Sequence, residues 1–239
     1  MKVLIDTDSP VYALASRCVN KKTGKLRPVK KLYSLIDQFI ESTVENTFAD
    51  DFEIHLTGND HIRRGICPLY KANRKGKAKP EYYNEAREYL IKEYDAQVSE
   101  GTEADDEVCI RYNEIIKEGG EAIVAHIDKD IDQLPGIHYN WTHDSIYTIT
   151  PEEGHYNLYL QSLTGDTADN IKALVGLGKK APGWLEGIAR TEKDLYGRCL
   201  ERYVEVFGNE EGTERLHRNM ELLYLYRAKD DKWTPPAND

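Results

Sequence analysis

Three short apolar segments, separated by stretches with helical spacing, constrain the fold of this 239-residue chain more than any other feature. The segments are residues 3–5, 52–56 and 122–127, and their length and content of Val, Ile and Leu are typical of buried strands. In the stretches between these segments, apolar residues recur every three or four positions, as in helices that cover a sheet. Strands that alternate with helices form a parallel sheet with both faces covered, so the sequence predicts an α/β core.

The second half of the chain shows a different pattern. Residues 146–150 and 156–160 alternate in polarity around a Pro-Glu-Glu-Gly sequence, which predicts an antiparallel hairpin. From about residue 161 the apolar spacing is helical almost to the end. We therefore expect a mainly helical region after the sheet.

Composition excludes some classes of protein. No apolar run approaches the ~20 residues that cross a bilayer, and the acid at position 6 comes too early for the apolar part of a secretory signal. The four cysteines include no C-x-x-C pair, so we interpret them as reduced thiols and not as a disulfide framework or a zinc site. The sequence predicts a cytoplasmic protein with no membrane partner.

The distribution of charge matters more than its sum. With 32 Lys and Arg against 42 Asp and Glu, the net charge of −10 alone disfavours a nucleic-acid partner. However, residues 9–36 and residues 61–80 each contain seven Lys or Arg residues and no acid. This segregation favours two basic surfaces, although solvated lysine-rich loops have the same pattern.

Acidic residues follow two of the predicted strands where those strands end. Asp6 and Asp8 come after the first strand, and Asp128, Asp130 and Asp132 come after the third. The carboxyl ends of parallel strands meet at one edge of a sheet, which is where ligands bind in such folds. We therefore expect these side chains to lie near one another.

Two further acidic groups begin predicted helices. They are residues 103–107 and residues 165–170, and Asp166 and Asp169 are expected on one face of the second helix. Each group taken alone is also compatible with an ordinary helix cap or turn. Carboxylates that converge repel one another unless cations neutralise them, and hard divalent ions such as Mg²⁺ do so with oxygen ligands. Together the groups predict a metal site.

The basic segment over residues 61–80 supplies groups that bind phosphate. Lys71 and Arg74, three positions apart, are expected to share a helical face and hold a phosphate diester. Tyr70 offers a ring for base stacking, although such tyrosines are more often part of a core. Later, residues 176–181 (GLGKKA) combine glycines, which let backbone amides approach phosphate, with two lysines.

In this order, the motifs resemble those of the 5′-nuclease superfamily, which includes flap endonucleases, the 5′-nuclease domains of bacterial DNA polymerase I and bacteriophage 5′→3′ exonucleases. The matching segments are residues 3–6, 70–74, 103–106, 128–130, 165–170 and 176–181. The resemblance implies a PIN-like parallel-sheet core over residues 1–160, with a helical arch around residues 61–100. It further implies that residues 161–239 form a helical region with a helix-hairpin-helix (helix-3-turn-helix) element. The compact length looks most like that of a phage member.

The resemblance also implies roles for individual residues. Lys71 and Arg74 would act on the scissile phosphate, and Asp128 would be a catalytic metal ligand. The implied metal ligands are Asp6, Glu103, Asp105 and Asp128 for one ion and Asp130, Asp166 and Asp169 for a second, with Asp106 between them or in the outer shell. The implied DNA contacts are Arg63, Arg64, Tyr70, Lys71, Arg74, Lys75, Gly176, Gly178, Lys179 and Lys180, often with a K⁺ ion at the glycine hairpin.

The implied activity is hydrolysis of DNA phosphodiesters by two Mg²⁺ ions about 4 Å apart, for which Mn²⁺ can substitute, leaving a 5′-phosphate and a 3′-hydroxyl. The expected substrate is duplex DNA with a 5′ end or flap, and the sequence does not separate DNA from an RNA·DNA hybrid. Such an enzyme removes primers or flaps during replication or repair. We expect a monomer in the cytoplasm, which is the host cytoplasm if a phage encodes the chain.

One position departs from the family pattern. An aspartate usually ends the second strand, whereas residues 57–60 here read TGND, so Asp60 or Asp8 is the candidate replacement. The missing acid favours a structure-specific DNA-binding protein without catalysis as one alternative. A haloacid-dehalogenase-type phosphatase is another, because its Asp-x-Asp start resembles residues 6–8, with Asp6 as nucleophile. That phosphatase accounts for neither the basic segment nor the glycine-rich one.

Overall fold

The computed structural model describes residues 1–239 except 21, 61, 173, 175–179 and 238–239. The chain forms two compact units, each assembled from three separate segments. Unit 1 contains residues 1–61, 77–128 and 136–148, and unit 2 contains residues 62–76, 129–135 and 149–239. Among the described residues, none of the helices combines the length and apolarity that crossing a bilayer requires.

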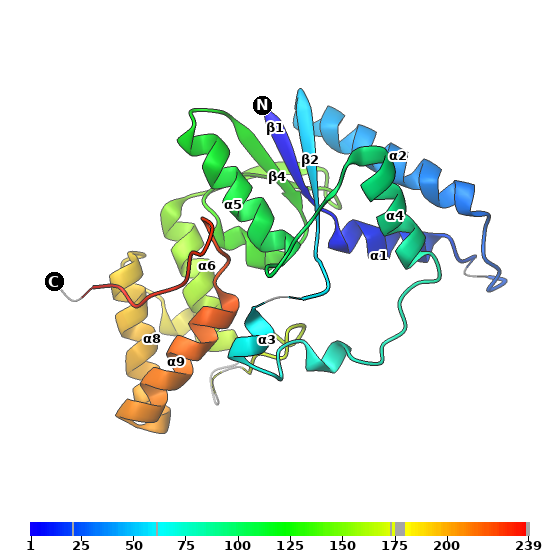
Figure 1. Ribbon diagram of the computed structural model, residues 1–239. Helices are drawn as coiled ribbons and strands as arrows, with labels where there is room; N and C mark the ends of the chain where they lie inside the picture. Colours follow the sequence, from blue (N-terminus) through cyan, green and yellow to red (C-terminus); the bar gives the residue numbers. More distant parts are fainter. Residues whose placement is uncertain (21, 61, 173, 175–179, 238–239) are drawn as a thin grey trace. The chain divides into compact units, whose positions relative to one another are not determined.

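Unit 1 is built on a six-stranded sheet in the order β3-β2-β1-β4-β5-β6. Figure 1 labels β1, β2 and β4 of this sheet. The strands are β1 (Lys2–Asp6), β2 (Asp51–Leu56), β3 (Gln97–Val98), β4 (Ala122–His126), β5 (Gly136–Asn140) and β6 (Ser145–Ile149). Strands β3, β2, β1, β4 and β5 pair in parallel. Only residues 141–144 join β5 to β6, and so short a connection requires an antiparallel pair. The predicted α/β core and its three apolar strands are confirmed.

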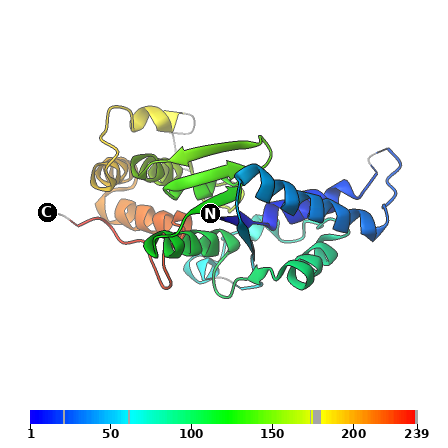
Figure 2. The same ribbon diagram turned by 90° about the horizontal axis from the view of Figure 1, so that it is seen from above.

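Helices cover both faces of this sheet. They are α1 (Asp8–Arg17), α2 (Val29–Thr47), α4 (Tyr83–Tyr94) and α5 (Ala104–Lys117). Val3 and Ile5 point into a core that they share with apolar residues of α1, α2 and α4, and Figure 2 shows α2 running beside α1. Helix α5 packs on β1, β2 and β4 and contributes nothing to that core, so it covers the opposite face. A strand buried on both faces is apolar in its centre, as β1 is from Val3 to Ile5.

Unit 2 is helical. Its elements are α3 (Arg63–Ile66), two 3₁₀ turns, η1 (Ala72–Arg74) and η2 (Lys129–Gln133), and α6 (Pro151–Thr164), α7 (Ala181–Trp184), α8 (Glu192–Phe207) and α9 (Asn209–Leu223). Helices α6, α8 and α9 pack together around a core that includes Tyr159, Cys199 and Met220. Tyr70 joins this core from the first third of the chain. Helix α6 spans residue 160. The domain boundary expected at residue 160 remains a prediction.

The predicted hairpin around residues 151–154 is wrong, because this sequence begins α6. The Thr150 hydroxyl accepts from the Glu153 amide at 3.2 Å, and the Glu153 carboxylate accepts from the Thr150 amide at 2.9 Å. This capping box, with Pro151 as the first helical residue, is a strong helix-start signal. Gly154 suits a close approach, since a Cβ there would lie 2.6 Å from the Gln133 carbonyl oxygen. Strand β6 pairs with β5 instead.

The helix expected to open at residues 165–170 is a turn. Asp166 Oδ1 accepts from the amides of Ala168 and Asp169 at 2.6 and 3.1 Å, and an isolated bridge joins Asp166 to Ile171. An aspartate that bonds the amides that follow it stabilises a turn as readily as a helix start. Asp166 and Asp169 are therefore neighbours in a closed loop and do not share a helical face.

Candidate functional site

The first carboxylate group lies at the carboxyl edge of the sheet in unit 1. Asp6 ends β1, is buried, and pairs in register with His55 of β2. Thr7 fixes this point, because its amide and its hydroxyl both donate to the His55 carbonyl, at 3.1 and 2.6 Å. Asp128 follows β4, the other neighbour of β1. Acids from two adjacent parallel strands therefore reach the same edge.

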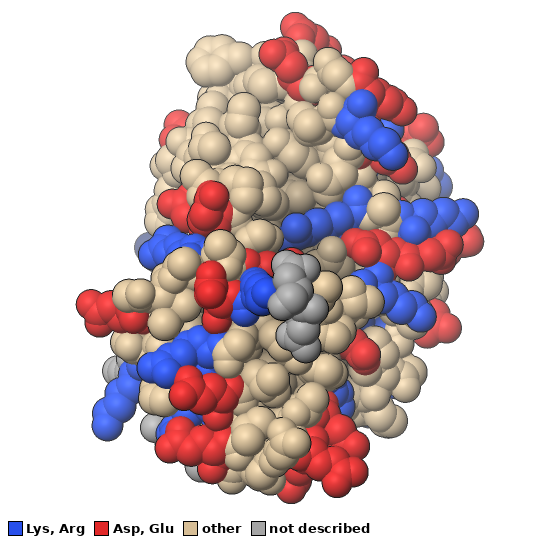
Figure 3. Space-filling view, turned by 90° about the vertical axis from the view of Figure 1, so that its left-hand side faces the viewer, with Lys and Arg blue, Asp and Glu red and all other residues tan. Residues whose placement is uncertain are grey.

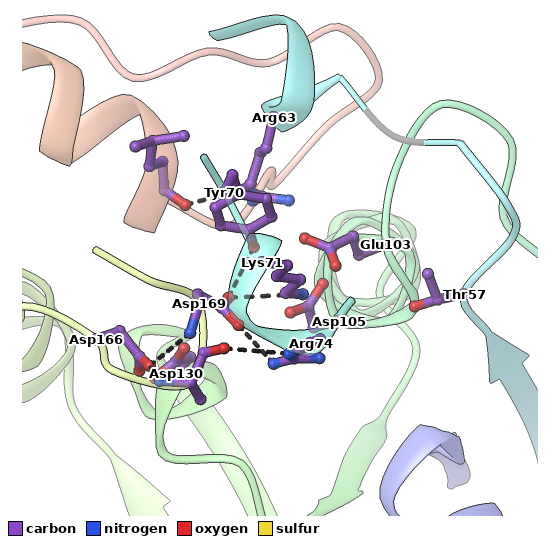
Figure 4. A network of polar contacts seen from close by, with 12 residues as sticks. Thr57, Arg63, Tyr70, Lys71, Arg74, Glu103, Asp105, Asp130, Asp166 and Asp169 are labelled. Atoms are coloured by element: carbon purple, nitrogen blue, oxygen red, sulfur yellow. Dashed lines mark hydrogen bonds and ion pairs between the residues drawn. The ribbon is translucent and has the colours of Figure 1, made fainter. Parts of the chain in front are cut away.

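Helix α5 brings further acids to this edge. The Ala104 amide donates to Thr57 Oγ1 at 2.9 Å, which anchors the start of α5 at the carboxyl end of β2. Glu103 and Asp105 stand at this helix start (Figure 4). Asp106 is fully buried and accepts from the Glu103 amide at 3.1 Å within a capping box. Asp106 thus holds the turn that presents the other two acids.

Thr57 occupies the strand end where the resemblance led us to expect an aspartate. Its amide donates to Asp8 Oδ1 at 3.2 Å. Arg87 donates to the Thr57 carbonyl at 2.7 Å and lies 3.5 Å from the same Asp8 oxygen. Asp60 is exposed. Of the two acids that could replace the missing one, Asp8 is the one bonded to the end of β2.

The second carboxylate group consists of Asp130, Asp166 and Asp169 and lies in unit 2. Lysine and arginine side chains of the same unit pair with these acids. Lys129 Nζ is 2.8 Å from Asp166 Oδ2 and 3.3 Å from Asp130 Oδ1. The Gln161 amide donates to Asp130 and lies 3.4 Å from Asp166 Oδ2. Burial alone would raise the pKa of Asp166, but the bonds from Lys129 and from the amide of Asp169 outweigh burial and hold that pKa below its ordinary value. Asp166 is therefore ionised at neutral pH.

The basic segment folds onto the third acid of this group. Tyr70 donates its hydroxyl to Asp169 Oδ2 at 2.7 Å, Lys71 Nζ lies 3.5 Å from the same oxygen, and Arg74 donates to Oδ1 at 2.5 Å (Figure 4). Lys71 has a positive φ of 54° and precedes the 3₁₀ turn η1. The shared helical face expected for Lys71 and Arg74 is wrong, but both cations reach one carboxylate.

Two of the expected DNA contacts are buried. Arg63 is 1% exposed, and its guanidinium donates to the carbonyls of Leu222 and Tyr224 at 3.0 and 2.7 Å. Tyr70 is 4% exposed, so its ring is not available for stacking on a base. Both side chains stabilise unit 2, which corrects the roles expected for them.

The remaining expected DNA contacts are on the surface or undescribed. Arg64, Lys75 and Lys180 are exposed. Gly176, Gly178 and Lys179 lie outside the described residues. On the face drawn in Figure 3, Lys and Arg side chains lie among Asp and Glu side chains in small groups. Helices α8 and α9 contribute the ion pairs Arg198–Glu201, Arg202–Glu205 and Arg215–Glu211.

The donor atoms of both carboxylate groups suit a hard divalent cation. In unit 1 the candidate ligands are carboxylates at one sheet edge, and in unit 2 they are three carboxylates on η2 and one loop. Oxygen-only donor sets of this kind favour Mg²⁺ or Mn²⁺ over the metals that prefer thiolate. The residues present therefore fit the metal that the sequence predicted.

Sequence reasoning missed the residues that arrange these acids. In the sequence Lys129 stands between Asp128 and Asp130, and this position alone could have indicated that it pairs with the acids. Thr57, Arg87 and Gln161 carry no motif, since their contacts depend on strands and helices that are distant in sequence. Such residues become visible only once the fold is known.

Two buried histidines make the stability of unit 1 depend on pH. Burial lowers the pKa of His55 and of His126 from 6.5 to about 4, against the opposing effects of Glu53 and of the Asp128 backbone. The unfolded chain takes up these protons near pH 6.5 and the folded chain only near pH 4. The free energy of unfolding is therefore full above pH 6.5 and falls toward pH 4, by about 1.4 kcal/mol per pH unit for each histidine.

Urea unfolding at pH 7.0 and pH 5.5 measures this effect. His55→Leu should reduce the difference in the free energy of unfolding between the two pH values, because it removes one buried histidine whose pKa is lowered. Among the described residues His55 Nε2 has no hydrogen-bond partner, so the substitution breaks no hydrogen bond at that atom. An unchanged pH dependence in His55→Leu would contradict the assignment.

Comparisons with known proteins show which proteins this chain resembles. No family model matches the chain. Flap endonuclease Xni of Shewanella pealeana is 29% identical over 146 residues, which cover 56% of this chain and 57% of that protein. The exodeoxyribonuclease of Enterobacteria phage T3 is 32% identical over 124 residues, covering 50% of this chain and 41% of that one. The chain thus spans about half the length of the curated relatives it matches.

A solved structure shares the fold over nearly the whole chain. The bacteriophage T5 flap endonuclease, in a complex with DNA and metal ions, superposes with a TM-score of 0.68 at 19% identity, covering 93% of this chain and 89% of that one. The fold, the order of the acidic motifs and the named relatives agree. These similarities indicate the 5′-nuclease superfamily.

Proposed function

We propose that the chain is a structure-specific 5′-nuclease that hydrolyses DNA phosphodiesters from a 5′ end or at a 5′ flap. It leaves a 5′-phosphate and a 3′-hydroxyl, and it acts as a monomer in the cytoplasm during replication or repair. The observation that carries this proposal is the convergence of Lys71 and Arg74 on the Asp169 loop, because it joins phosphate-binding cations to a carboxylate group suited to metal. The T5 relative, in complex with DNA and metal ions, supports the same substrate.

The proposed ligands divide between the two units. In unit 1, Asp6, Glu103, Asp105 and Asp128 would hold one Mg²⁺ or Mn²⁺ ion, and Asp8 replaces the acid missing from the end of β2. In unit 2, Asp130, Asp166 and Asp169 would hold a second. Two such ions, when bound, supply an activated water and stabilise the leaving oxygen. A K⁺ ion at residues 176–181 belongs to the same proposal.

The protein side chains bind and orient the phosphate. Lys71 and Arg74 are held by Asp169 in the free protein. A scissile phosphate offers the same kind of oxygen acceptor as the Asp169 carboxylate. Lys71 and Arg74 can therefore bind the phosphate in place of that carboxylate while they stay beside the loop. Their charge then offsets the negative charge that develops on the phosphoryl oxygens.

Cleavage of end-labelled DNA tests the proposed function. A 5′-flap substrate and a blunt duplex are incubated with Mg²⁺, with Mn²⁺ and with EDTA, and products are sized and tested for a 5′-phosphate. We expect metal-dependent release from the 5′ end. An RNA·DNA hybrid in the same assay decides whether RNA is also a substrate. Tight flap binding without cleavage in either metal would instead identify a DNA-binding protein, and a phosphate trapped on Asp6 would identify a phosphatase.

Lys71→Ala is expected to slow cleavage about 100-fold and to weaken duplex binding less than threefold. The reason is that a cation beside the reacting phosphate stabilises the transition state more than the ground state. Single-turnover rates and DNA dissociation constants, measured on the same preparation, separate the two effects. Lys229→Ala is the matched control, because Lys229 is exposed, belongs to the same unit and is not among the expected DNA contacts. Equal losses of rate and affinity in Lys71→Ala would show that Lys71 only docks DNA.

A further inference from the structure

A buried polar cluster next to Asp128 has no role in the proposed chemistry. It joins His126 of β4, His138 of β5 and Tyr147 of β6, and the two histidines are 1% and 0% exposed. His126 Nε2 lies 2.8 Å from His138 Nδ1, and the Tyr147 hydroxyl lies 3.3 Å from the same Nε2. The His138 and Tyr147 rings stack at 5.4 Å. Polar groups buried this deeply are costly unless their hydrogen bonds are specific.

The cluster has one consistent direction of hydrogen bonding. His126 Nδ1 lies 2.8 Å from the backbone carbonyl oxygen of Asp128, and a carbonyl can only accept. His126 therefore carries its proton on Nδ1. In the neutral ring Nε2 then has one in-plane lone pair, and His138 Nδ1, the nearer group at 2.8 Å, donates to it. The Asp128 carbonyl and His138 thus fix the tautomer and the ring orientation of His126, and the Tyr147 hydroxyl lies beside Nε2 at 3.3 Å.

We infer that His126 is a positioning residue for Asp128, holding the backbone that aims this carboxylate at a metal ion. This inference rests on the proposed function, which makes Asp128 a ligand. Asp128 lies two residues beyond the last residue of β4. The bond from His126 restrains the Asp128 carbonyl, and so it limits the rotations that would turn the side chain away. A ligand held in place before binding takes up metal more tightly.

Two substitutions at one position separate positioning from simple stability. In His126→Asn the amide nitrogen lies near the place of Nδ1 and can still donate to the Asp128 carbonyl. In His126→Gln the polar group lies near Nε2, so contact with His138 is kept and the bond to Asp128 is lost. A purely structural role predicts that metal affinity follows stability in both variants. Positioning predicts that metal affinity follows only the bond to Asp128.

Mn²⁺ binding, measured by electron paramagnetic resonance without DNA, is the readout. We expect His126→Gln to lower Mn²⁺ affinity tenfold or more and His126→Asn to stay within about threefold of the parent protein. Urea unfolding of both variants shows how far stability changes. Equal Mn²⁺ affinities in the two variants, or a weaker one in His126→Asn, would overturn the inference.

A measurement on the unaltered protein covers the case in which either variant fails to fold. Nitrogen NMR of the histidine rings at pH 7 should show His126 protonated at Nδ1 and not at Nε2, and the opposite tautomer would overturn the inference. Asp128→Asn distinguishes this result from a failure of the proposed function. If Mn²⁺ binding does not depend on Asp128, the ligand assignment fails. If it does and His126→Gln binds Mn²⁺ normally, only the positioning role fails.

Discussion

Asp128→Asn is expected to lower the rate of Mg²⁺-dependent cleavage by a factor on the order of 10³ or more. The substitution keeps the size of the side chain but removes the negative charge that a divalent cation needs from its ligand. DNA binding should change less than threefold, since phosphate contacts come from cations elsewhere in the chain. Single-turnover cleavage of a 5′-flap substrate, together with a dissociation constant measured in EDTA, checks both parts.

Asp95→Asn is the matched control for this experiment. Asp95 belongs to the same unit, is exposed, and has a left-handed backbone (φ 52°) that asparagine also tolerates. We expect its activity to match that of the parent protein. Cleavage that persists at the parental rate in Asp128→Asn would remove Asp128 from the ligand set.

Arg63→Ala is expected to lower the free energy of unfolding by about 3–5 kcal/mol, the largest loss of stability that we anticipate for a single substitution. The change leaves the Leu222 and Tyr224 carbonyls without their donor in a buried region and removes the cation stacked 5.3 Å from the Tyr226 ring. Because α3 packs on α9 through this residue, the loss should fall on unit 2. Urea unfolding with a far-ultraviolet circular dichroism signal measures it.

The adjacent residue gives the control for Arg63→Ala. Arg64 carries the same side chain but is exposed, so Arg64→Ala should change the free energy of unfolding by less than about 0.5 kcal/mol. A phosphate contact at Arg63 would produce the opposite pattern, with stability unchanged and DNA affinity reduced. That outcome would restore the role that the sequence predicted for Arg63.

The sequence was sufficient for the elements whose signal is local. Strands β1, β2 and β4 were predicted because a short apolar run can be buried on both faces only inside a parallel sheet. The start of α5 was predicted because acids after Thr102 favour the positive end of a helix. The carboxyl edge of the sheet followed from these elements without further information.

The sequence failed where one local pattern serves two structures. Thr150, Pro151 and Glu153 mark a helix start, but the flanking residues alternate in polarity, and that alternation is equally typical of a hairpin. Lys71 and Arg74 are spaced as on a helix, yet the left-handed backbone at Lys71 brings both to Asp169. Such a conformation leaves no trace in a single sequence when the residue is not glycine.

The sequence predicted the acidic residues of the site but not the contacts that hold them in place. Asp6 stood out because it follows a predicted strand, and Glu103 stood out because it begins a predicted helix. Arg63 was misread because two consecutive arginines in a basic segment look like a surface patch. Its partners lie about 160 residues further along the chain, at Leu222 and Tyr224. No local pattern encodes a contact of that range.

The division of each unit into three chain segments affects how the protein is made. Residues 62–76 leave the ribosome well before α9 has been synthesised, so Arg63 must stay hydrated until its carbonyl partners emerge. Tyr70 likewise waits for the rest of its core. Most of unit 2 therefore assembles only after α9 has been synthesised, and nascent chains that stall before α9 expose apolar surface to chaperones and proteases.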